Sequence, residues 1–351
     1  MPQNLVGASE VAELLNVSKQ TLVNWRAKGD FPEPVADLKS GPVWDQGDVL
    51  RWAQQKDIKT LPKATQSRAQ VVAVTNMKGG VGKSTLTANF GWYCAAVGKR
   101  VLLVDLDPQF NLSQYVLGVS RYEKLVKADS PTILDIFEQV GISAISTVAP
   151  KRESTAAIVK VASWATSSKG ALDLVPSRLE LAWTLKNPQF KEKPLAKFVK
   201  KVSPDYDLIL IDCPPTESIL TEAAYLASDW VLVPVKPEFL SAIGLHLLGR
   251  SLREFKERNE DSKIEVGGIV FNLTYPDKPE HQLSKKEVLR TAKENGWKVF
   301  ENQVSYSDSY PRGSRLGRPI FRTNYARWEK VTEFKSVARE FMDAIGLQQT
   351  S

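Results

Sequence analysis

Between a short β-branched run and a segment with helical spacing, the sequence reads Lys78-Gly79-Gly80-Val81-Gly82-Lys83-Ser84-Thr85. A glycine-rich turn between a strand and a helix lets backbone N–H groups approach phosphate oxygens, and the helix N-terminus adds partial positive charge. At this spacing Lys83 can reach the β- and γ-phosphates, and the Ser84 hydroxyl can ligate Mg²⁺. The alternative is a glycine-rich turn that binds no ligand. Such a turn would not need a strand before it, a helix after it and Lys-Ser-Thr at the start of that helix, and all three are present here. The stretch therefore predicts a nucleotide-phosphate site that also uses Gly79, Gly80, Val81, Gly82 and Thr85.

Runs like the one before this turn recur along the chain and predict buried strands. They are Val71–Thr75, Val101–Val104, Ala171–Val175, Leu208–Ile211, Trp230–Val235 and Ile264–Phe271. The segments with helical periodicity between them include Lys83–Val97, Ser218–Ala227, Ala242–Glu257 and Ser284–Asn295. Strands that alternate with helices in this way are typical of a parallel sheet covered on both faces. The expected fold class is therefore α/β, with a doubly wound, mostly parallel sheet.

The composition is that of an ordinary globular protein. The 351 residues are 42% hydrophobic and 25% charged, which excludes disordered and collagenous classes. The 47 Lys+Arg against 40 Asp+Glu give a net charge of +7, which permits a polyanionic partner without requiring one. Two cysteines cannot form a disulfide framework and indicate a reducing compartment, and no apolar run approaches the length of a membrane span. We expect a cytoplasmic protein.

The glycine-rich turn departs from an ordinary P-loop at its start. The glycine expected six positions before Lys83 is Met77, and a second lysine, Lys78, follows it. With these residues the chain resembles the ParA/MinD family of deviant Walker ATPases, and the resemblance covers about residues 70–345. It implies that Lys78 reaches across an ATP-sandwich dimer to the partner's nucleotide. A cation supplied in trans would neutralise charge on the transferring phosphoryl group and make hydrolysis depend on dimerisation.

Two further segments carry carboxylates at the family's positions. Val101–Gln109 resembles the Walker A′ segment, which implies that Asp107 orients or activates the attacking water and that Asp105 supports the metal indirectly. Leu208–Thr216 resembles the Walker B segment, which implies that Asp212 holds Mg²⁺ through water at the carboxyl end of a buried strand. A single carboxylate of this kind is more often a solvated loop residue or a helix cap. Together with the P-loop, the set favours a catalytic site.

The resemblance also covers the expected base pocket. Val233–Glu238 resembles the segment that flanks the base and the dimer face, and Ile269–Asn272 ends a strand as the adenine-contacting segment does. This makes Asn272 an ATP-binding candidate. One departure is Phe110, where the family usually has glycine. A bulky residue there predicts an altered switch loop or partner contact, and the sequence does not choose between them.

The same fold serves several kinds of function in this family. Nitrogenase-type reductases bridge an iron–sulfur cluster with cysteines, and the positions of Cys94 and Cys213 do not suit that work. MinD proteins end in a short amphipathic helix that lies on the membrane. The helix predicted at Arg327–Ile345 instead carries an apolar stripe that we expect to pack on the sheet. Its members are Trp328, Val331, Phe334, Val337, Phe341 and Ile345. We therefore expect no membrane partner.

A basic segment near the C-terminus favours DNA. Tyr310–Arg327 holds five arginines and no acidic residue, interleaved with aromatic residues. It resembles the loop before Gly-x-Pro-Ile-Phe that carries sequence-independent DNA contacts in partition ATPases. Arginines pair with phosphates without reading sequence, so the binding would be salt-sensitive. The candidates are Arg312, Arg315, Arg318 and Arg322; a solvated basic face is the alternative.

Residues 1–56 predict a small, mainly helical winged helix-turn-helix domain, joined by a polar linker at 57–69 to the ATPase domain at 70–348. Ser18 would cap a second helix on which Leu22 and Trp25 face the core. The side chains left for a major groove are Lys19, Gln20, Asn24 and Arg26. Gly41–Trp52 resembles the wing and following helix of MerR- or excisionase-type proteins. A dimerisation or protein-docking module is the alternative.

The resemblance as a whole implies a ParA-type partition ATPase that uses ATP and Mg²⁺ and hydrolyses ATP weakly without its partner. The ATP-bound homodimer would bind nonspecific DNA on the nucleoid, and a ParB-like centromere-binding protein would stimulate hydrolysis and release it. The N-terminal domain would bind an operator as an autorepressor. Two alternatives stay open: an ATP-switched transcription regulator without cargo, and a positioning ATPase for a protein assembly.

Overall fold

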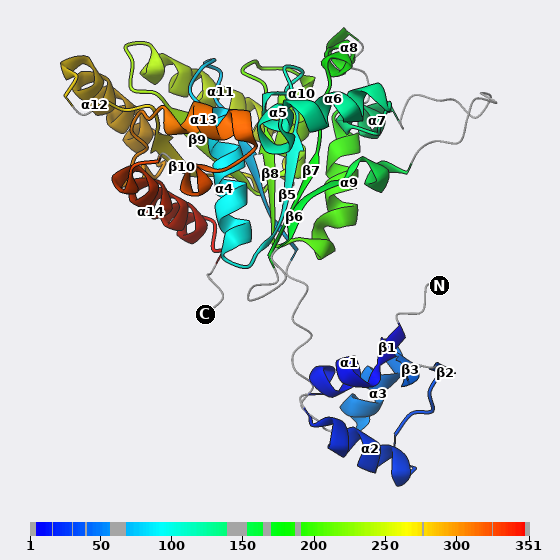
Figure 1. The fold of residues 1–351 in the computed structure, drawn as a ribbon. Helices are drawn as coiled ribbons and strands as arrows, with labels where there is room; N and C mark the ends of the chain where they lie inside the picture. Colours follow the sequence, from blue (N-terminus) through cyan, green and yellow to red (C-terminus); the bar gives the residue numbers. More distant parts are fainter. Residues whose placement is uncertain are drawn as a thin grey trace. The chain divides into compact units, whose positions relative to one another are not determined.

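The computed structural model describes residues 5–15, 17–29, 31–38, 41–56, 68–138, 153–163, 170–186, 191–275, 277–324 and 326–347. The chain divides into two compact units, residues 1–67 and 68–351, and Figure 1 shows the fold of each. Most of the linker predicted at 57–69 lies outside the described residues.

The described residues of the smaller unit form three helices and a three-stranded antiparallel sheet in the order β1-β3-β2 (Figure 1). Its elements are β1 (Leu5–Gly7), α1 (Ala8–Leu14), α2 (Lys19–Ala27), β2 (Ala36–Leu38), β3 (Gly41–Asp45) and α3 (Gln46–Gln55). The predicted cap of α2 is confirmed, because the Ser18 hydroxyl accepts a hydrogen bond from the Thr21 N–H at 3.1 Å. The core consists of Val11, Leu15, Leu22, Phe31, Trp44, Val49 and Ala53. Rings of Trp25 and Trp52 pack against Phe31 and extend this small core.

The larger unit is built on a seven-stranded sheet in the order β10-β9-β4-β8-β5-β7-β6 (Figure 1). Its strands are β4 (Gln70–Val74), β5 (Arg100–Asp105), β6 (Val159–Ser163), β7 (Ala171–Val175), β8 (Leu208–Asp212), β9 (Trp230–Val235) and β10 (Glu265–Phe271). All six strands expected from the sequence are confirmed and pair in parallel. The central ones are buried on both faces, which is why they read as continuous apolar runs.

Helices cover both faces of this sheet. One face carries α7 (Ile133–Glu138), α9 (Lys193–Val202), α10 (Ile219–Ala227), α11 (Ser241–Arg258) and α12 (Pro279–Glu294). The other carries α4 (Lys83–Ala96), α5 (Asn111–Leu117), α6 (Val119–Lys127), α13 (Ser309–Leu316) and α14 (Trp328–Ala344). A short helix, α8 (Ala182–Lys186), and four 3₁₀ turns complete the described part: Ser154–Ala157, Leu179–Leu181, Ser203–Asp205 and Ile320–Arg322. The doubly wound arrangement is confirmed.

Three details differ from the sequence-based expectations. The sheet has an antiparallel edge strand, β6, that was not predicted because it is half-exposed and lacks a continuous apolar run. The segment before Gly-x-Pro-Ile-Phe is not a loop at its start but the helix α13. Trp328 does not belong to the buried stripe of α14, since it lies in the first turn and is 75% exposed, whereas Phe334, Val337 and Phe341 are buried as expected.

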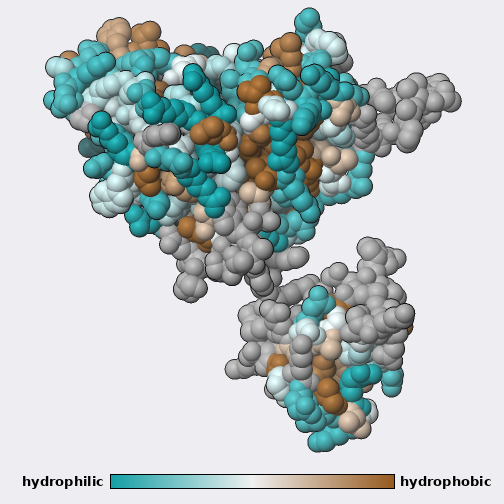
Figure 2. Space-filling model, in the orientation of Figure 1, coloured by the Kyte–Doolittle hydropathy of each residue, from teal (hydrophilic) through white to brown (hydrophobic). Residues whose placement is uncertain are grey.

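No helix in the described part of the chain is both long and apolar enough to cross a bilayer. The face drawn in Figure 2 mixes hydrophilic side chains with small hydrophobic areas.

Candidate nucleotide-binding site

The glycine-rich turn lies between β4 and α4, as predicted, and its backbone requires glycine. Gly80 and Gly82 have φ angles of +71° and +86°, a region that L side chains rarely adopt. A Cβ at Gly82 would also stand 2.2 Å from the Asn272 amide nitrogen. That amide donates a hydrogen bond of 2.7 Å to the Val81 carbonyl. The Asn272 side chain is thus buried beneath the turn and holds it, so its predicted contact with adenine stays a prediction.

A second asparagine, Asn76, fixes the start of the turn and was missed in the sequence. Its side-chain amide donates to the Pro234 carbonyl of β9 at 2.7 Å, and its Oδ1 accepts from the Lys78 N–H at 2.9 Å. The turn is therefore tied to the neighbouring strands β9 and β10 through two buried amides. A polar residue directly after a buried strand is the only sequence signal that pointed to it.

Lys83 lies folded back over the turn. It is only 7% exposed, and its ammonium donates to the carbonyls of Asn76 at 3.1 Å and Lys78 at 3.3 Å. Burial lowers the pKa of Lys83, and the nearby Asp212 opposes that effect. The ammonium is thus held by weak, neutral acceptors at the mouth of the phosphate site, and an anionic phosphate would be a stronger partner.

Asp212 ends β8 directly beside Asp105, which ends β5. Asp212 is fully buried, and neither carboxylate oxygen has a hydrogen-bond partner within the part of the chain that the structure describes. Burial, together with the charge of Asp105, raises its pKa well above the ordinary value. The nearby Ser84 side chain and the Lys83 charge oppose the shift, and a cation would further stabilise a carboxylate that is buried in this way. Because carboxylate and hydroxyl oxygens are the donors Mg²⁺ prefers, Asp212 and Ser84 fit that ion.

Asp105 has both carboxylate oxygens occupied by protein donors. One accepts from the Asp107 N–H at 3.2 Å, and the other accepts from the Ser113 N–H at 2.8 Å and the Ser113 hydroxyl at 2.6 Å. Burial raises the pKa of Asp105 to about 7, although the Ser113 bonds oppose the shift. The carboxylate thus anchors the loop that carries Asp107, and its predicted support of the metal stays a prediction.

Asp107 borders an open cavity of about 390 Å³ at the carboxyl edge of the sheet. The cavity is lined by Gly79, Gly80, Gly82, Lys83, Ser84, Thr85, Asp107, Gln109, Asn111, Gln114, Tyr115, Pro215 and Ser314. The turn, the predicted water-activating carboxylate and the Walker lysine therefore face one space. Burial raises the pKa of Asp107. The Gln109 N–H donates a hydrogen bond of 2.9 Å to its carboxylate, and this bond opposes the shift.

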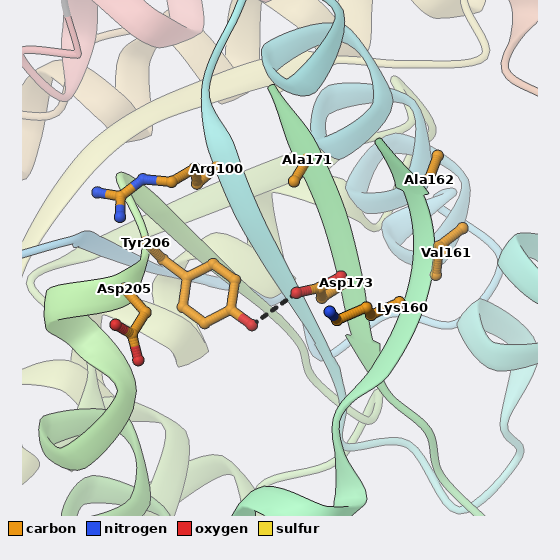
Figure 3. Close-up of a pocket in the computed structure, with 8 residues that line it drawn as sticks. All are labelled: Arg100, Lys160, Val161, Ala162, Ala171, Asp173, Asp205 and Tyr206. Carbon is orange, nitrogen blue, oxygen red and sulfur yellow. Dashed lines mark hydrogen bonds between the residues drawn. The ribbon is translucent and has the colours of Figure 1, made fainter. Parts of the chain in front are cut away.

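Another cavity, of about 500 Å³, lies where β5 and β7 begin, at the opposite edge of the sheet from the glycine-rich turn (Figure 3). The Tyr206 hydroxyl donates to the Asp173 carboxylate there at 2.8 Å. None of the residues predicted to bind phosphate lines this 500 Å³ cavity. The ends of the strands, rather than cavity size, identify the nucleotide site, because ligands of open α/β sheets bind at the carboxyl edge.

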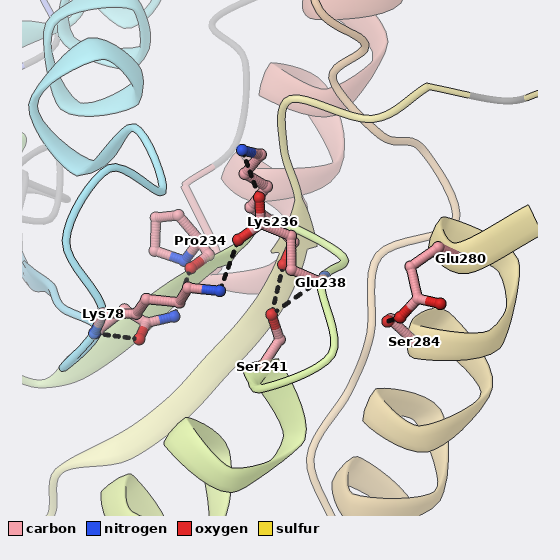
Figure 4. Close-up of polar contacts among 8 residues, drawn as sticks. Lys78, Pro234, Lys236, Glu238, Ser241, Glu280 and Ser284 are labelled. Atoms are coloured by element: carbon pink, nitrogen blue, oxygen red, sulfur yellow. Dashed lines mark hydrogen bonds and ion pairs between the residues drawn. The ribbon is translucent and has the colours of Figure 1, made fainter. Parts of the chain in front are cut away.

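Lys78 does not face the 390 Å³ cavity in the single chain. Its ammonium lies 2.6 Å from a carboxylate oxygen of Glu238, which also pairs with Lys236 (Figure 4). Hydrogen bonds from these two lysines lower the pKa of Glu238 to about 2. Next to this cluster, the residues directly before α11 and on its first two turns include exposed apolar side chains. They are Phe239, Leu240, Ile243 and Leu247.

The predicted DNA-contacting arginines all lie exposed around α13 and the following turn. Arg312 and Arg315 are on α13, Arg318 follows it, and Arg322 ends the 3₁₀ turn. The side chains of Arg315 and Arg318 form no ion pair or hydrogen bond with the described residues. In the same helix, Ser314 lines the nucleotide cavity. The basic segment therefore begins at the wall of the phosphate site.

Asn89, on the P-loop helix α4, joins these two regions and was not singled out in the sequence. Its amide donates to the Tyr115 hydroxyl at 2.8 Å and to the Thr85 carbonyl at 2.8 Å. Its Oδ1 accepts from the Ile320 N–H at 2.8 Å, within the arginine segment. Both Thr85 and Tyr115 line the nucleotide cavity. One buried side chain thus connects the cavity wall to the backbone between Arg318 and Arg322.

In the smaller unit, Gln20 and Asn24 are exposed one helical turn apart on α2, with a hydrogen bond of 3.4 Å between them. Arg26 lies over the Trp44 ring at 5.2 Å, on the side of the sheet. The side chain of Lys19 lies outside what the structure describes. Gln20, Asn24 and Arg26 are thus all exposed, and Arg26 also contacts the Trp44 ring of β3.

The doubly wound sheet and the glycine-rich turn at its carboxyl edge define the P-loop ATPase class. A family model described as an AAA domain matches residues 69–266.

An uncharacterized protein of Mycobacterium tuberculosis is 31% identical over 82% of this chain and 82% of its own length. The chromosome partitioning protein ParA of Caulobacter vibrioides is 30% identical over 72% of this chain and 86% of its own length. Among solved structures, an ATP complex of McdA from Cyanothece has a TM-score of 0.64 at 19% identity, covering 81% of this chain and 99% of that one. The chain belongs to the ParA/Soj-like family of P-loop ATPases.

Proposed function

We propose that this chain is a DNA partition ATPase whose ATP-bound dimer holds nonspecific DNA and releases it on hydrolysis. The observation that carries the proposal is the 390 Å³ cavity, on which Lys83, Ser84 and Asp107 converge beside the unpaired carboxylate of Asp212. Phosphoryl transfer needs positioning and charge neutralisation more than covalent chemistry, and these residue types supply both. The similarity to ParA of Caulobacter vibrioides supports the same class of activity.

Each residue at the cavity has a distinct task in this proposal. The N–H groups of Gly79 to Thr85 and the Lys83 ammonium hold the phosphates. Ser84 and Asp212 hold Mg²⁺, which supplies charge neutralisation at the phosphate oxygens when bound. Asp107 orients the attacking water and accepts its proton, and its loop is anchored from behind by Asp105.

Dimerisation completes the site. Lys78 is paired with Glu238 of its own chain at 2.6 Å, outside the phosphate cavity. For Lys78 to act on the partner's nucleotide, this ion pair must break, and contact with the γ-phosphate is the stronger alternative. The exposed apolar side chains of Phe239, Leu240, Ile243 and Leu247 lie beside the pair and would be covered by the second subunit. This arrangement makes hydrolysis depend on the dimer.

DNA binding is assigned to Arg312, Arg315, Arg318 and Arg322. Because Ser314 lines the phosphate cavity and Asn89 bonds both the cavity wall and Ile320, nucleotide binding can order the arginine segment. The dimer would thereby bind nucleoid DNA with ATP and lose it after hydrolysis. A ParB-like protein on the cargo would stimulate that step.

The N-terminal unit is assigned a second, specific DNA contact. The capped helix α2, with the exposed pair Gln20 and Asn24, and the antiparallel β2–β3 strands that follow match the parts of a winged helix-turn-helix. Amide side chains in a major groove read adenine. The unit would bind an operator and repress the chain's own genes.

The test of the enzymatic part compares the wild type with Asp107→Ala. Phosphate release and molecular mass are measured with ATP and Mg²⁺, and Asp343→Ala, an exposed aspartate on α14, is the matched control. We expect Asp107→Ala to form the ATP-dependent dimer but to lose about 100-fold or more in turnover. Hydrolysis by Asp107→Ala at the wild-type rate would overturn the assignment of the water-activating residue.

A further inference from the structure

Phe110, where the family usually has glycine, stands in a backbone conformation that favours glycine. Its φ and ψ are 47° and 28°, in the left-handed region, directly before α5. It is one of three non-glycine residues with positive φ in the described part of the chain. Bulky residues adopt this region only when the surrounding structure imposes it, and such residues concentrate at functional sites.

The surroundings impose it through one aromatic contact. The Phe110 ring stacks on Tyr122 of α6, with ring centroids 5.2 Å apart and an interplanar angle of 13°. Tyr122 is buried, and Phe110 is half-buried against the same side of the core. A glycine at position 110 would adopt the backbone conformation freely but would have no ring to stack.

Tyr122 in turn belongs to a chain of hydrogen bonds that ends at Asp107. Its hydroxyl donates to the Ser177 carbonyl at 3.0 Å, and the Ser177 N–H donates to the Ser113 hydroxyl at 2.8 Å. That hydroxyl donates to Asp105 at 2.6 Å, and Asp105 accepts from the Asp107 N–H.

Phe110 is also linked directly to Asp107, because its N–H donates to the Asp107 carbonyl at 2.8 Å. The loop of residues 106–110 is thus held at both ends, by Asp105 at its start and by the ring stack at its end.

We propose that Phe110 is a positioning residue for hydrolysis. Its stack on Tyr122 holds the 106–110 loop so that Asp107 faces the phosphate cavity before nucleotide binds. This inference rests on the role proposed above for Asp107. Phe110 itself does not line the cavity, so it acts on turnover through Asp107 and not on ATP binding.

The test is a set of steady-state measurements with ATP, Mg²⁺ and random-sequence duplex DNA on the full chain. Phe110→Gly should lower kcat about threefold or more and leave KM for ATP within about twofold, because a misplaced catalytic group slows the chemical step without weakening ground-state binding. Phe110→Asn should behave like Phe110→Gly, since asparagine tolerates positive φ but offers no ring. Phe110→Tyr keeps the ring and should retain at least about half of the wild-type kcat.

Tyr122→Leu tests the same contact from the other side and serves if Phe110→Gly fails to fold. It removes the ring stack and also the hydrogen bond to the Ser177 carbonyl, so it should lower kcat at least as much as Phe110→Gly does. Adding Phe110→Gly to Tyr122→Leu should lower kcat no further, since the stack is already lost. Wild-type kcat in Phe110→Asn or Tyr122→Leu would overturn the inference, as would equal losses in kcat and in ATP affinity. A wild type that hydrolyses no ATP overturns the proposed function and this inference together, whereas active wild type with unchanged variants overturns this inference alone.

Discussion

The nucleotide cavity and the arginine segment beside it are built in opposite ways. At the cavity, Asn76, Lys83 and Asp105 are buried and bonded to backbone groups before any ligand arrives. In the arginine segment, Arg315 and Arg318 are exposed and make no ion pair within the described residues. The cavity is preorganised for one ligand geometry, whereas the segment presents charge to a partner of any sequence. Asn89 is the buried link between the two.

The largest effect is expected at the preorganised side. Lys83→Ala removes the only ammonium that is folded over the turn in the described part of the chain. Productive ATP binding should fall by about 100-fold or more, because the charge-assisted contact between phosphate and a largely buried ammonium is lost. Binding of a fluorescent ATP analogue measures it. Wild-type affinity would show that the turn alone holds the phosphates.

The second prediction separates a lysine that acts in trans from one that acts in cis. Lys78→Ala and Asp107→Ala should each be inactive as homodimers. An equal mixture should recover about a quarter of wild-type turnover, because half of the dimers are mixed and each has one intact site. Phosphate release on mixing measures it. A mixture as inactive as its components would place the action of Lys78 within its own chain, where the Glu238 pair already holds it.

The third prediction concerns Asn89, the buried link between the nucleotide cavity and the arginine segment. Asn89→Ala leaves the Ile320 N–H without its buried acceptor. The ratio of DNA affinities with ATP and with ADP should fall about threefold or more, with ATP binding retained. Tyr115→Phe removes only one of the Asn89 bonds and should have a smaller effect. An unchanged affinity ratio in both variants, measured by fluorescence anisotropy, would show that nucleotide and DNA communicate by another route.

Much of the cavity could be predicted from the sequence because its parts depend on local spacing. The glycine-rich turn must follow a buried strand, and the carboxyl ends of parallel strands meet at one edge, so Asp105 and Asp212 come together. The Lys78–Glu238 pair joins residues 160 positions apart, and the hydrogen bond between Ile320 and Asn89 joins residues 231 positions apart. No local pattern contains such contacts, since they depend on how distant elements pack.

The exposure of side chains was the other feature that the sequence could not predict. Trp328 fits the spacing of the apolar stripe on α14 but sits in the first turn, beyond the edge of the core, where periodicity does not reveal what covers it. The edge strand β6 was missed for a similar reason, because a strand with one free side lacks the continuous apolar run of a central strand.

The smallest effect concerns stability without ligands. The pKa of Asp212 is raised by burial, so the unfolded chain loses this proton at lower pH than the folded chain does. Folding stability therefore falls as pH rises above about 4, and the loss persists at neutral pH. Asp212→Asn removes the cost of ionising this buried carboxyl. It should raise Tm by a few degrees at pH 8 without Mg²⁺, with a smaller gain at pH 5. Calorimetry at both pH values measures it. A lower Tm at pH 8 would show that the carboxylate is stabilised.

The most direct test of the account is binding of the full chain to a random-sequence DNA duplex with ATP and Mg²⁺, with ADP and Mg²⁺, and without nucleotide. The same titrations are made with Arg315→Ala plus Arg318→Ala, and with Lys286→Ala plus Arg290→Ala, which removes two exposed charges from α12. We predict salt-sensitive binding with ATP only, lost in the first double variant and kept in the second. Absence of nonspecific binding in every nucleotide state would contradict the account and leave the N-terminal unit as the DNA contact of an ATP-switched regulator.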